Sequence, residues 1–187
     1  MSTKVVTGKV RFSYCNIWEP KAVDGGEPKY SVNLLIPKSD TVTLGKIKAA
    51  MKEAAENFRK KNGAASLPAS PITPLHDGDG TKPNSGEPYG PECKGHWVMT
   101  VSSSAKQKPI VVDAAGNAIL DPSEVYSGCY GRASINFYGY NNRKKGIGVG
   151  LLAIQKLHDG EPFGTIGSAD DFNDGYVDQD ENDDFLG

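Results

Sequence analysis

The sequence has 187 residues, enough for one domain with a sizeable core and too few for two ordinary ones, and its 22 glycines and 12 prolines favour a β-rich fold. No stretch is apolar over the roughly 18 residues that a bilayer requires, and the N-terminus lacks a signal-peptide core, so we expect a cytoplasmic protein. The net charge of -2 averages residues 1–167, with 21 basic and 15 acidic side chains (+6), and residues 168–187, with eight acidic and none basic. This asymmetry is typical of a polyanion-binding body with an acidic interaction tail.

Two strands are predicted at the start of the chain. Residues 5–18 alternate in polarity and predict a long first strand. One of its faces carries Val6, Val10, Phe12 and Tyr14, and the other carries Lys9, Arg11 and Ser13. After a turn at Gly25 and Gly26, a second strand ending at Pro37 is predicted from the period-two series Tyr30, Val32, Leu34 and Ile36. The two strands should form a hairpin.

One amphipathic helix is predicted at about residues 42–61. Apolar side chains recur there at helical spacing, as in Leu44, Ile47, Met51 and Phe58. Asp40 or Thr41 is available as the N-cap, and Gly63 is placed to end the helix. We interpret the lysines and arginines on its other face as a solvated surface rather than a DNA contact.

Residues 64–95 form a long segment that holds six of the twelve prolines. So many turn-forming residues predict a loop without regular structure, and a loop of this length is usually functional or mobile. Four apolar side chains are expected to attach this loop to the β-barrel that the strands should form: Leu67, Ile72, Leu75 and Tyr89.

Strands resume after this loop, at residues 96–103, 109–113, 125–140 and 146–157. The last two should form a hairpin with a cationic tip at residues 141–146. The expected fold is therefore mainly β, an OB-fold-like barrel within residues 1–167, followed by a disordered acidic tail at 168–187.

Cationic and aromatic side chains alternate with core residues on the strand at 130–140 and on the first strand. Cations follow phosphates while aromatic rings stack on unpaired bases, so this combination predicts binding of single-stranded DNA. The candidate binding residues, expected to line one groove, are Lys9, Arg11, Tyr14, Trp18, Arg132, Tyr138, Tyr140, Arg143, Lys144 and Lys145. For any one of them, β-propensity or solubility is an equally good explanation.

The tail cannot bury enough apolar surface to fold, and it places aromatic residues among acids. Such a segment can mimic DNA in the protein's own cationic groove and can bind replication or recombination proteins. The residues expected to act in this way are Phe172, Tyr176, Asp183, Asp184 and Phe185. A tail that serves only solubility is the alternative.

No catalytic motif is recognisable, and we expect neither an enzyme nor a cofactor. Cys15, Cys93 and Cys129 are odd in number and widely spaced, which predicts buried thiols rather than disulfides. Cys93 and His96 lack a second pair of ligands, so no metal is expected. Three alternatives stay open: an RNA-binding or strand-annealing OB protein, a metal-dependent nuclease using Asp77 and Asp79, and an interaction protein whose tail is the functional part.

Three segments, residues 8–40, residues 125–164 and the acidic end, resemble the phage single-stranded DNA-binding proteins once catalogued as DUF2815. The resemblance covers nearly the whole chain. It implies an OB-fold body, sequence-independent binding of single-stranded DNA during phage replication or recombination, and a tail like those of other single-strand binders. The site of action would be the host bacterial cytoplasm.

Overall fold

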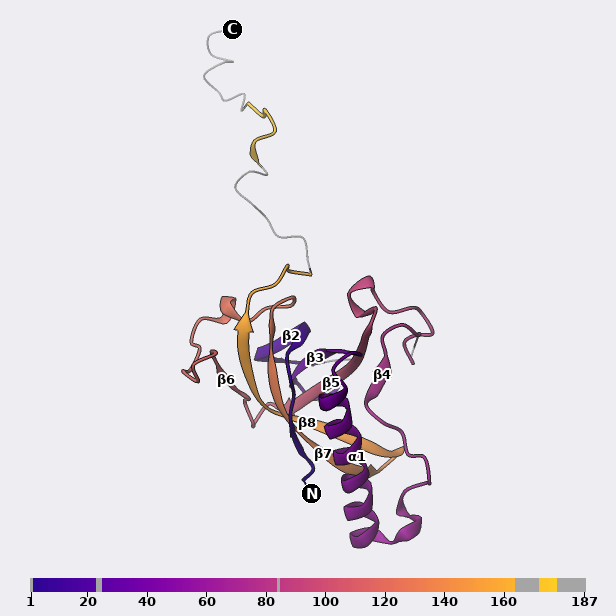
Figure 1. Cartoon of the computed structure of the whole chain (residues 1–187). Coiled ribbons are helices and arrows are strands. Elements are labelled where there is room, and N and C mark those ends of the chain that lie inside the picture. The colour runs from indigo at the N-terminus through magenta and orange to yellow at the C-terminus, as the bar shows by residue number, and fades with distance from the viewer. Residues whose placement is uncertain (1, 23–24, 84, 164–171, 178–187) are drawn as a thin grey trace, which may run out of the picture.

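The computed structural model describes residues 2–22, 25–83, 85–163 and 172–177. Eight strands and one α-helix occur in these ranges (Figure 1). In chain order they are β1 Lys4–Val6, β2 Val10–Lys21, β3 Lys29–Pro37, α1 Thr41–Asn62, β4 Leu75–Asp77, β5 His96–Ser104, β6 Ile110–Val112, β7 Tyr130–Asn141 and β8 Lys145–His158. Three short 3-10 turns are η1 Ala64–Ser66, η2 Pro91–Cys93 and η3 Pro122–Glu124.

Five strands close into a barrel in the order β7-β2-β3-β5-β8, with β8 pairing back onto β7. The pairs are antiparallel except for β5 and β8, which run parallel where Ser102 meets Gly150. β1 extends the edge beside β7, β4 pairs with β5, and β6 pairs with β8. A five-stranded, partly open barrel of this kind is the OB architecture. The expected OB-fold-like barrel is confirmed.

The helix α1 lies between β3 and β5 in the chain and packs against β7, β1 and β8. The Asp40 carboxylate accepts a hydrogen bond from the Thr43 amide at 3.1 Å, and Gly63 ends the helix with φ of 102°. Both caps and the predicted extent are therefore confirmed. Among the described residues, no helix combines the length and apolarity needed to cross a membrane.

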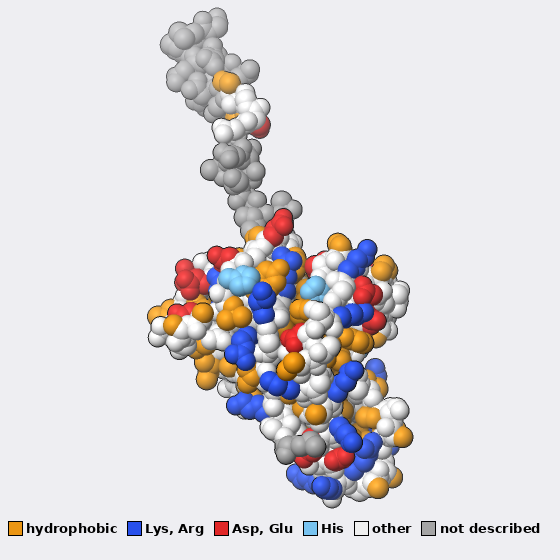
Figure 2. Space-filling view, in the orientation of Figure 1, with side chains coloured by type: hydrophobic (Ala, Val, Ile, Leu, Met, Phe, Trp, Pro, Cys, Tyr) orange, Lys and Arg blue, Asp and Glu red, His pale blue; other side chains and the backbone are white. Residues whose placement is uncertain are grey.

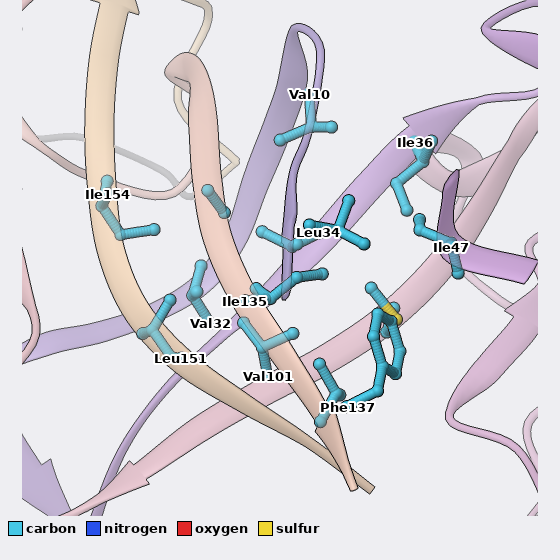
Figure 3. Packing of buried hydrophobic residues seen from close by; sticks show 14 of the residues in the cluster. Val10, Val32, Leu34, Ile36, Ile47, Val101, Ile135, Phe137, Leu151 and Ile154 are labelled. Atoms are coloured by element: carbon cyan, nitrogen blue, oxygen red, sulfur yellow. The ribbon is translucent and has the colours of Figure 1, made fainter. Parts of the chain in front are cut away.

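The core fills the barrel and continues under α1. Figure 3 shows side chains from β3, β5, β7 and β8 pointing toward one another, with Ile47 of α1 beside Ile36 of β3. The predicted inward face of the second strand is confirmed, because its four apolar side chains are all buried: Tyr30, Val32, Leu34 and Ile36. A closed barrel with a helix over its end leaves the outward strand faces available for binding.

The predicted first strand differs from the structure in two ways. It is divided into β1 and β2 by a turn at residues 7–9, in which the Gly8 amide donates to the Thr43 hydroxyl at 2.9 Å. Val6 is consequently 41% exposed, and a bulge at Tyr14 turns that ring outward as well. Of the four residues predicted to share one face, only Val10 and Phe12 are buried.

The long loop also contains more structure than expected. The segment includes η1, β4 and η2, and β4 pairs with β5 through Leu75 and Met99. Leu67 is buried in the core, while Leu75 and Tyr89 are partly buried against apolar clusters, so these three attachments are confirmed. Ile72 is attached through its backbone instead, since its carbonyl accepts from the Ile147 amide at 2.7 Å and its side chain is exposed.

Candidate nucleic-acid interface

A groove of about 670 Å³ lies on the outer face of β2, β3 and β5. Its floor consists of side chains that alternate with core residues of these strands: Ser13, Asn33, Leu35, Val98 and Thr100. The loop between β4 and β5 forms a wall of the groove with these residues: Lys82, Pro83, Ser85, Tyr89, Gly90, Glu92 and Cys93. β3 and β5 are the second and third strands of the barrel, and this face of OB folds binds oligonucleotides and oligosaccharides.

Apolar packing and an ion-paired lysine hold the loop over the groove. Leu35, Cys93 and Val98 form a buried cluster on the outer face, and Tyr89 packs against it. Beside them, Lys38 Nζ lies 2.6 Å from an Asp77 oxygen and 2.7 Å from an Asp79 oxygen. Asp79 also accepts from the Gly95 amide at 3.1 Å, so one ammonium joins the end of β3 to both ends of the loop.

The same lysine bears on the nuclease alternative. Its hydrogen bonds hold the pKa of Asp77 and of Asp79 below the usual range, so both carboxylates are ionised and share one ammonium of the protein as their partner. No group of three or more potential metal ligands occurs in the described part of the chain. In this structure the two aspartates join Lys38, at the end of β3, to the loop.

The three cysteines are buried or half-buried free thiols, as predicted. Burial raises the pKa of Cys15 to about 12, and it raises the pKa of Cys93 and of Cys129 as well. Because the thiolate is the reactive form, these groups remain chemically quiet at neutral pH.

Tyr14 is the aromatic side chain best presented to the groove. Its backbone has φ of 49°, the one left-handed non-glycine among the described residues, within the bulge between Ser13 and Asn16. The ring is 65% exposed and lines the groove. A left-handed backbone at a non-glycine residue costs on the order of 1 kcal/mol, and such strain is typical of functional positions.

The floor of the groove continues toward the loop between β2 and β3. A shallower hollow of about 330 Å³ shares Thr100 with the groove. Its other lining residues are Lys21, Gly26, Glu27, Lys29, Ser31 and Ser102. Two lysines thus lie at this end, whereas the groove itself has one lysine, Lys82, and one acid, Glu92.

Lys9, in the turn before β2, and Arg11, on β2, both lie above the Tyr130 ring. The Lys9 ammonium is 5.7 Å and the Arg11 guanidinium 5.2 Å from the ring centroid. Tyr130 in turn stacks on His158 with centroids 4.7 Å apart. Arg11 donates to the Gly128 carbonyl at 2.9 Å and to the Glu161 carbonyl at 2.6 Å, so it also has a structural task.

The aromatic and basic residues of the last hairpin lie elsewhere. Tyr138 is 50% exposed and its ring lies against Gly148 on the paired strand. The Tyr140 hydroxyl points to Gly146, near the segment around Ile72. Tyr138 is eight residues along β7 from Tyr130, roughly 26 Å at the usual rise. Arg143, Lys144 and Lys145 are exposed at the tip.

The remaining two candidates are held by hydrogen bonds. Arg132 Nε donates to the Thr7 carbonyl at 2.8 Å, and the side chain lines a cleft between β1 and α1. Trp18 packs against the core, and its indole N–H lies 3.4 Å from the Val125 carbonyl. The ten candidates therefore occupy several places around the barrel and do not form the single groove that was expected.

Within the tail, Phe172 and Tyr176 are 85% and 76% exposed. Asp183, Asp184 and Phe185 lie outside the described residues. Figure 2 shows basic side chains over the barrel and over the end where α1 lies, which agrees with the positive charge of the body.

Comparison with known proteins identifies the family. The family model described as the Enterobacter phage Enc34 ssDNA-binding protein matches residues 3–186. The chain belongs to this family. It is 33% identical to the single-stranded DNA-binding protein from bacteriophage Enc34, solved in complex with ssDNA; the match has a TM-score of 0.69 and covers 87% of this chain and 90% of that one. The resemblance to phage single-stranded DNA-binding proteins that was inferred from the sequence is confirmed.

One further relative and one further solved structure of similar fold extend the Enc34 comparison. The putative protein p50 of Acyrthosiphon pisum secondary endosymbiont phage 1 is 32% identical over 181 residues, which cover 91% of this chain and 93% of the relative. The gp2.5 single-stranded DNA-binding protein of bacteriophage T7 is 14% identical with a TM-score of 0.61, over 88% of this chain and 97% of that one, and it supports the fold alone.

Sequence reasoning missed several residues of the groove and its surroundings. Tyr89 and Lys82 reach the groove through the long loop, whose position depends on contacts with residues far away in the chain. The length of that loop and its single tyrosine were the available signals. Tyr130 begins the predicted alternating strand and lies on the same face as the candidate Arg132, so the same face argument would have included it.

Proposed function

We propose that this chain binds single-stranded DNA without sequence preference during phage DNA replication or recombination, in the host cytoplasm. The groove over β3 and β5 is the observation that carries the proposal, because it lies on the OB face used for oligonucleotides. Membership of the Enc34 family supports it.

The chemistry of the groove suits unpaired bases. Tyr14 and Tyr89 approach from the strand and from the loop, and stacking on such rings accepts any base. The polar floor is partly used internally, since the Thr100 hydroxyl donates to the Asn33 side-chain oxygen at 2.7 Å. We propose no catalytic activity, because the one acidic pair considered for it is bound to Lys38.

A fluorescence titration with single-stranded and duplex DNA of equal length tests the function. We expect tighter binding of the single strand, weakening with salt by roughly 0.7 in the log-log slope for each phosphate neutralised. Homopolymers of different base should bind similarly. Equal affinity for the duplex, or an affinity that salt leaves unchanged, would contradict the proposal; an RNA strand of equal length tests the RNA-binding alternative.

We also propose that residues 168–187 compete with DNA for the basic surface and recruit replication or recombination proteins when DNA displaces them. The body carries +6 and the tail eight acids, which supports an electrostatic contact between them. Phe163 is the last described residue of the body before the tail, and it lies against the Leu35 cluster, 4.2 Å from the Arg11 guanidinium. A tethered segment starting there has a high effective concentration, typically millimolar.

Deleting residues 168–187 should tighten single-stranded DNA binding at low salt, and the gain should shrink as screening rises. The matched control keeps the length of the tail and replaces its aspartates and glutamate by asparagines and glutamine. Both variants should behave alike in an anisotropy titration, because the competition depends on charge. Unchanged or weaker binding by the deletion variant would exclude competition.

A further inference from the structure

A second basic site lies apart from the groove, in a cleft of about 380 Å³ between β1 and α1. Its lining residues are Ser2, Lys4, Val5, Val6, Lys46, Ala49 and Arg132. Three of these are cationic and none is acidic. They come from three separate elements, β1, α1 and β7, so their meeting is a product of the tertiary fold.

The three cations are not neutralised by the protein. The ion pairs of the described residues involve Lys38 and Lys156 only. Arg132 is oriented by the bond from its Nε to the Thr7 carbonyl, which leaves its terminal amino groups for another acceptor. Lys4 and Lys46 are exposed. Cations gathered beside the apolar Val5 and Ala49 repel one another until an anion binds, and a cleft of one charge sign concentrates anions.

The cleft is connected to the groove by further basic side chains. Arg11 pairs with Leu35, which lines the groove, and Arg11 and Lys9 share the Tyr130 ring. Two residues beyond Tyr130 on β7 is Arg132, whose carbonyl partner Thr7 belongs to the same short turn as Lys9. The order from groove to cleft is Arg11, Lys9, Arg132, Lys4 and Lys46.

We propose that this cleft binds the phosphodiester backbone of a strand whose bases lie in the groove, at nucleotides that flank the stacked ones. The inference rests on the proposed function. The groove supplies aromatic rings but only Lys82 against Glu92, so most of the phosphate charge must be met outside it. The cleft meets it on one side, and Lys21 and Lys29 lie on the other.

The test compares a Lys4→Gln/Lys46→Gln variant with a Lys48→Gln/Lys60→Gln control. The control removes the same charge from exposed positions of α1 that do not line the cleft. Each protein is titrated with oligothymidylates of about 6 and about 20 nucleotides. One OB fold covers roughly 4–16 nucleotides, so the short strand is near the lower limit of this range and the long strand exceeds it. Thermal melts verify that all the variants are folded.

We expect the cleft variant to bind the long oligonucleotide about 5- to 25-fold more weakly than the control does. Each lost contact between a lysine and a phosphate should lower the affinity about fivefold. Its salt slope should fall by roughly 1.4, for two phosphates. Its affinity for the short oligonucleotide should match the control. A cleft variant that matches the control on the long strand, or that loses equally on both, overturns the inference. A parent protein that binds neither strand overturns the proposed function and this inference with it.

Discussion

Tyr14→Ala should weaken single-stranded DNA binding by about 5- to 150-fold, the loss of one stacked base at about 1–3 kcal/mol. The ring is 65% exposed in the groove and contributes little to the core, so the melting temperature should hardly change. Tyr14→Phe should retain most of the affinity, because stacking needs the ring and not the hydroxyl. An anisotropy titration at fixed salt measures all of these values.

Tyr138→Ala is the matched comparison, since Tyr138 is also an exposed tyrosine on a strand but lies near the far end of β7. We expect its affinity to stay close to that of the parent. Tyr89→Ala should weaken binding in the same sense as Tyr14→Ala, with some added loosening of the loop that Tyr89 helps to anchor. If Tyr138→Ala loses affinity and Tyr14→Ala does not, the stacking site is at the hairpin, and the proposal that bases stack in the groove is wrong.

Phe12→Ala should lower the free energy of unfolding by about 3–5 kcal/mol, the usual cost of emptying a buried phenylalanine site. Phe12 is fully buried, and its ring packs so closely on Gly131 that a Cβ there would lie 2.6 Å from it. The barrel wall cannot collapse into the space, because β2 and β7 are hydrogen-bonded on both sides of it. Urea unfolding followed by fluorescence measures the change.

Phe172→Ala provides the control for the same change of residue type. Phe172 is 85% exposed, so its removal should leave the urea midpoint within experimental error. Equal midpoints for Phe12→Ala and Phe172→Ala would show that the core is not where the structure places it.

Most of the fold could be predicted because its signals are local. The helix at Thr41–Asn62 has caps and spacing within one stretch of sequence, and the inward face of β3 follows from alternation alone. The break at residues 7–9 was hidden because its partner, the Thr43 hydroxyl, is 35 residues away. Alternation placed Tyr14 on the same face as Val10 and Phe12, because it assumes an unbroken register, which the bulge interrupts.

The site was harder to predict, because its parts meet only in three dimensions. Tyr14 was recognised as a candidate, but its neighbours in the groove come from a loop some 70 residues further along the chain. No sequence pattern marks Lys4 or Lys46 as a binding residue. They form a basic cleft with Arg132 only because β1 packs on α1. Charge segregation was visible from the sequence; the placement of the charges was not.

The bulge in β2 divides the strand into two halves, in which apolar side chains at even and at odd positions, respectively, point into the core. Before it the buried apolar residues are at even positions, Val10 and Phe12, and after it the buried apolar residue is Ile17. The extra residue lets both halves keep their apolar side chains inside while Tyr14 leaves the alternation altogether. Position 14 can therefore vary in evolution without a compensating change in the interior, so the proposed contact between this residue and DNA can change independently of the stability of the barrel.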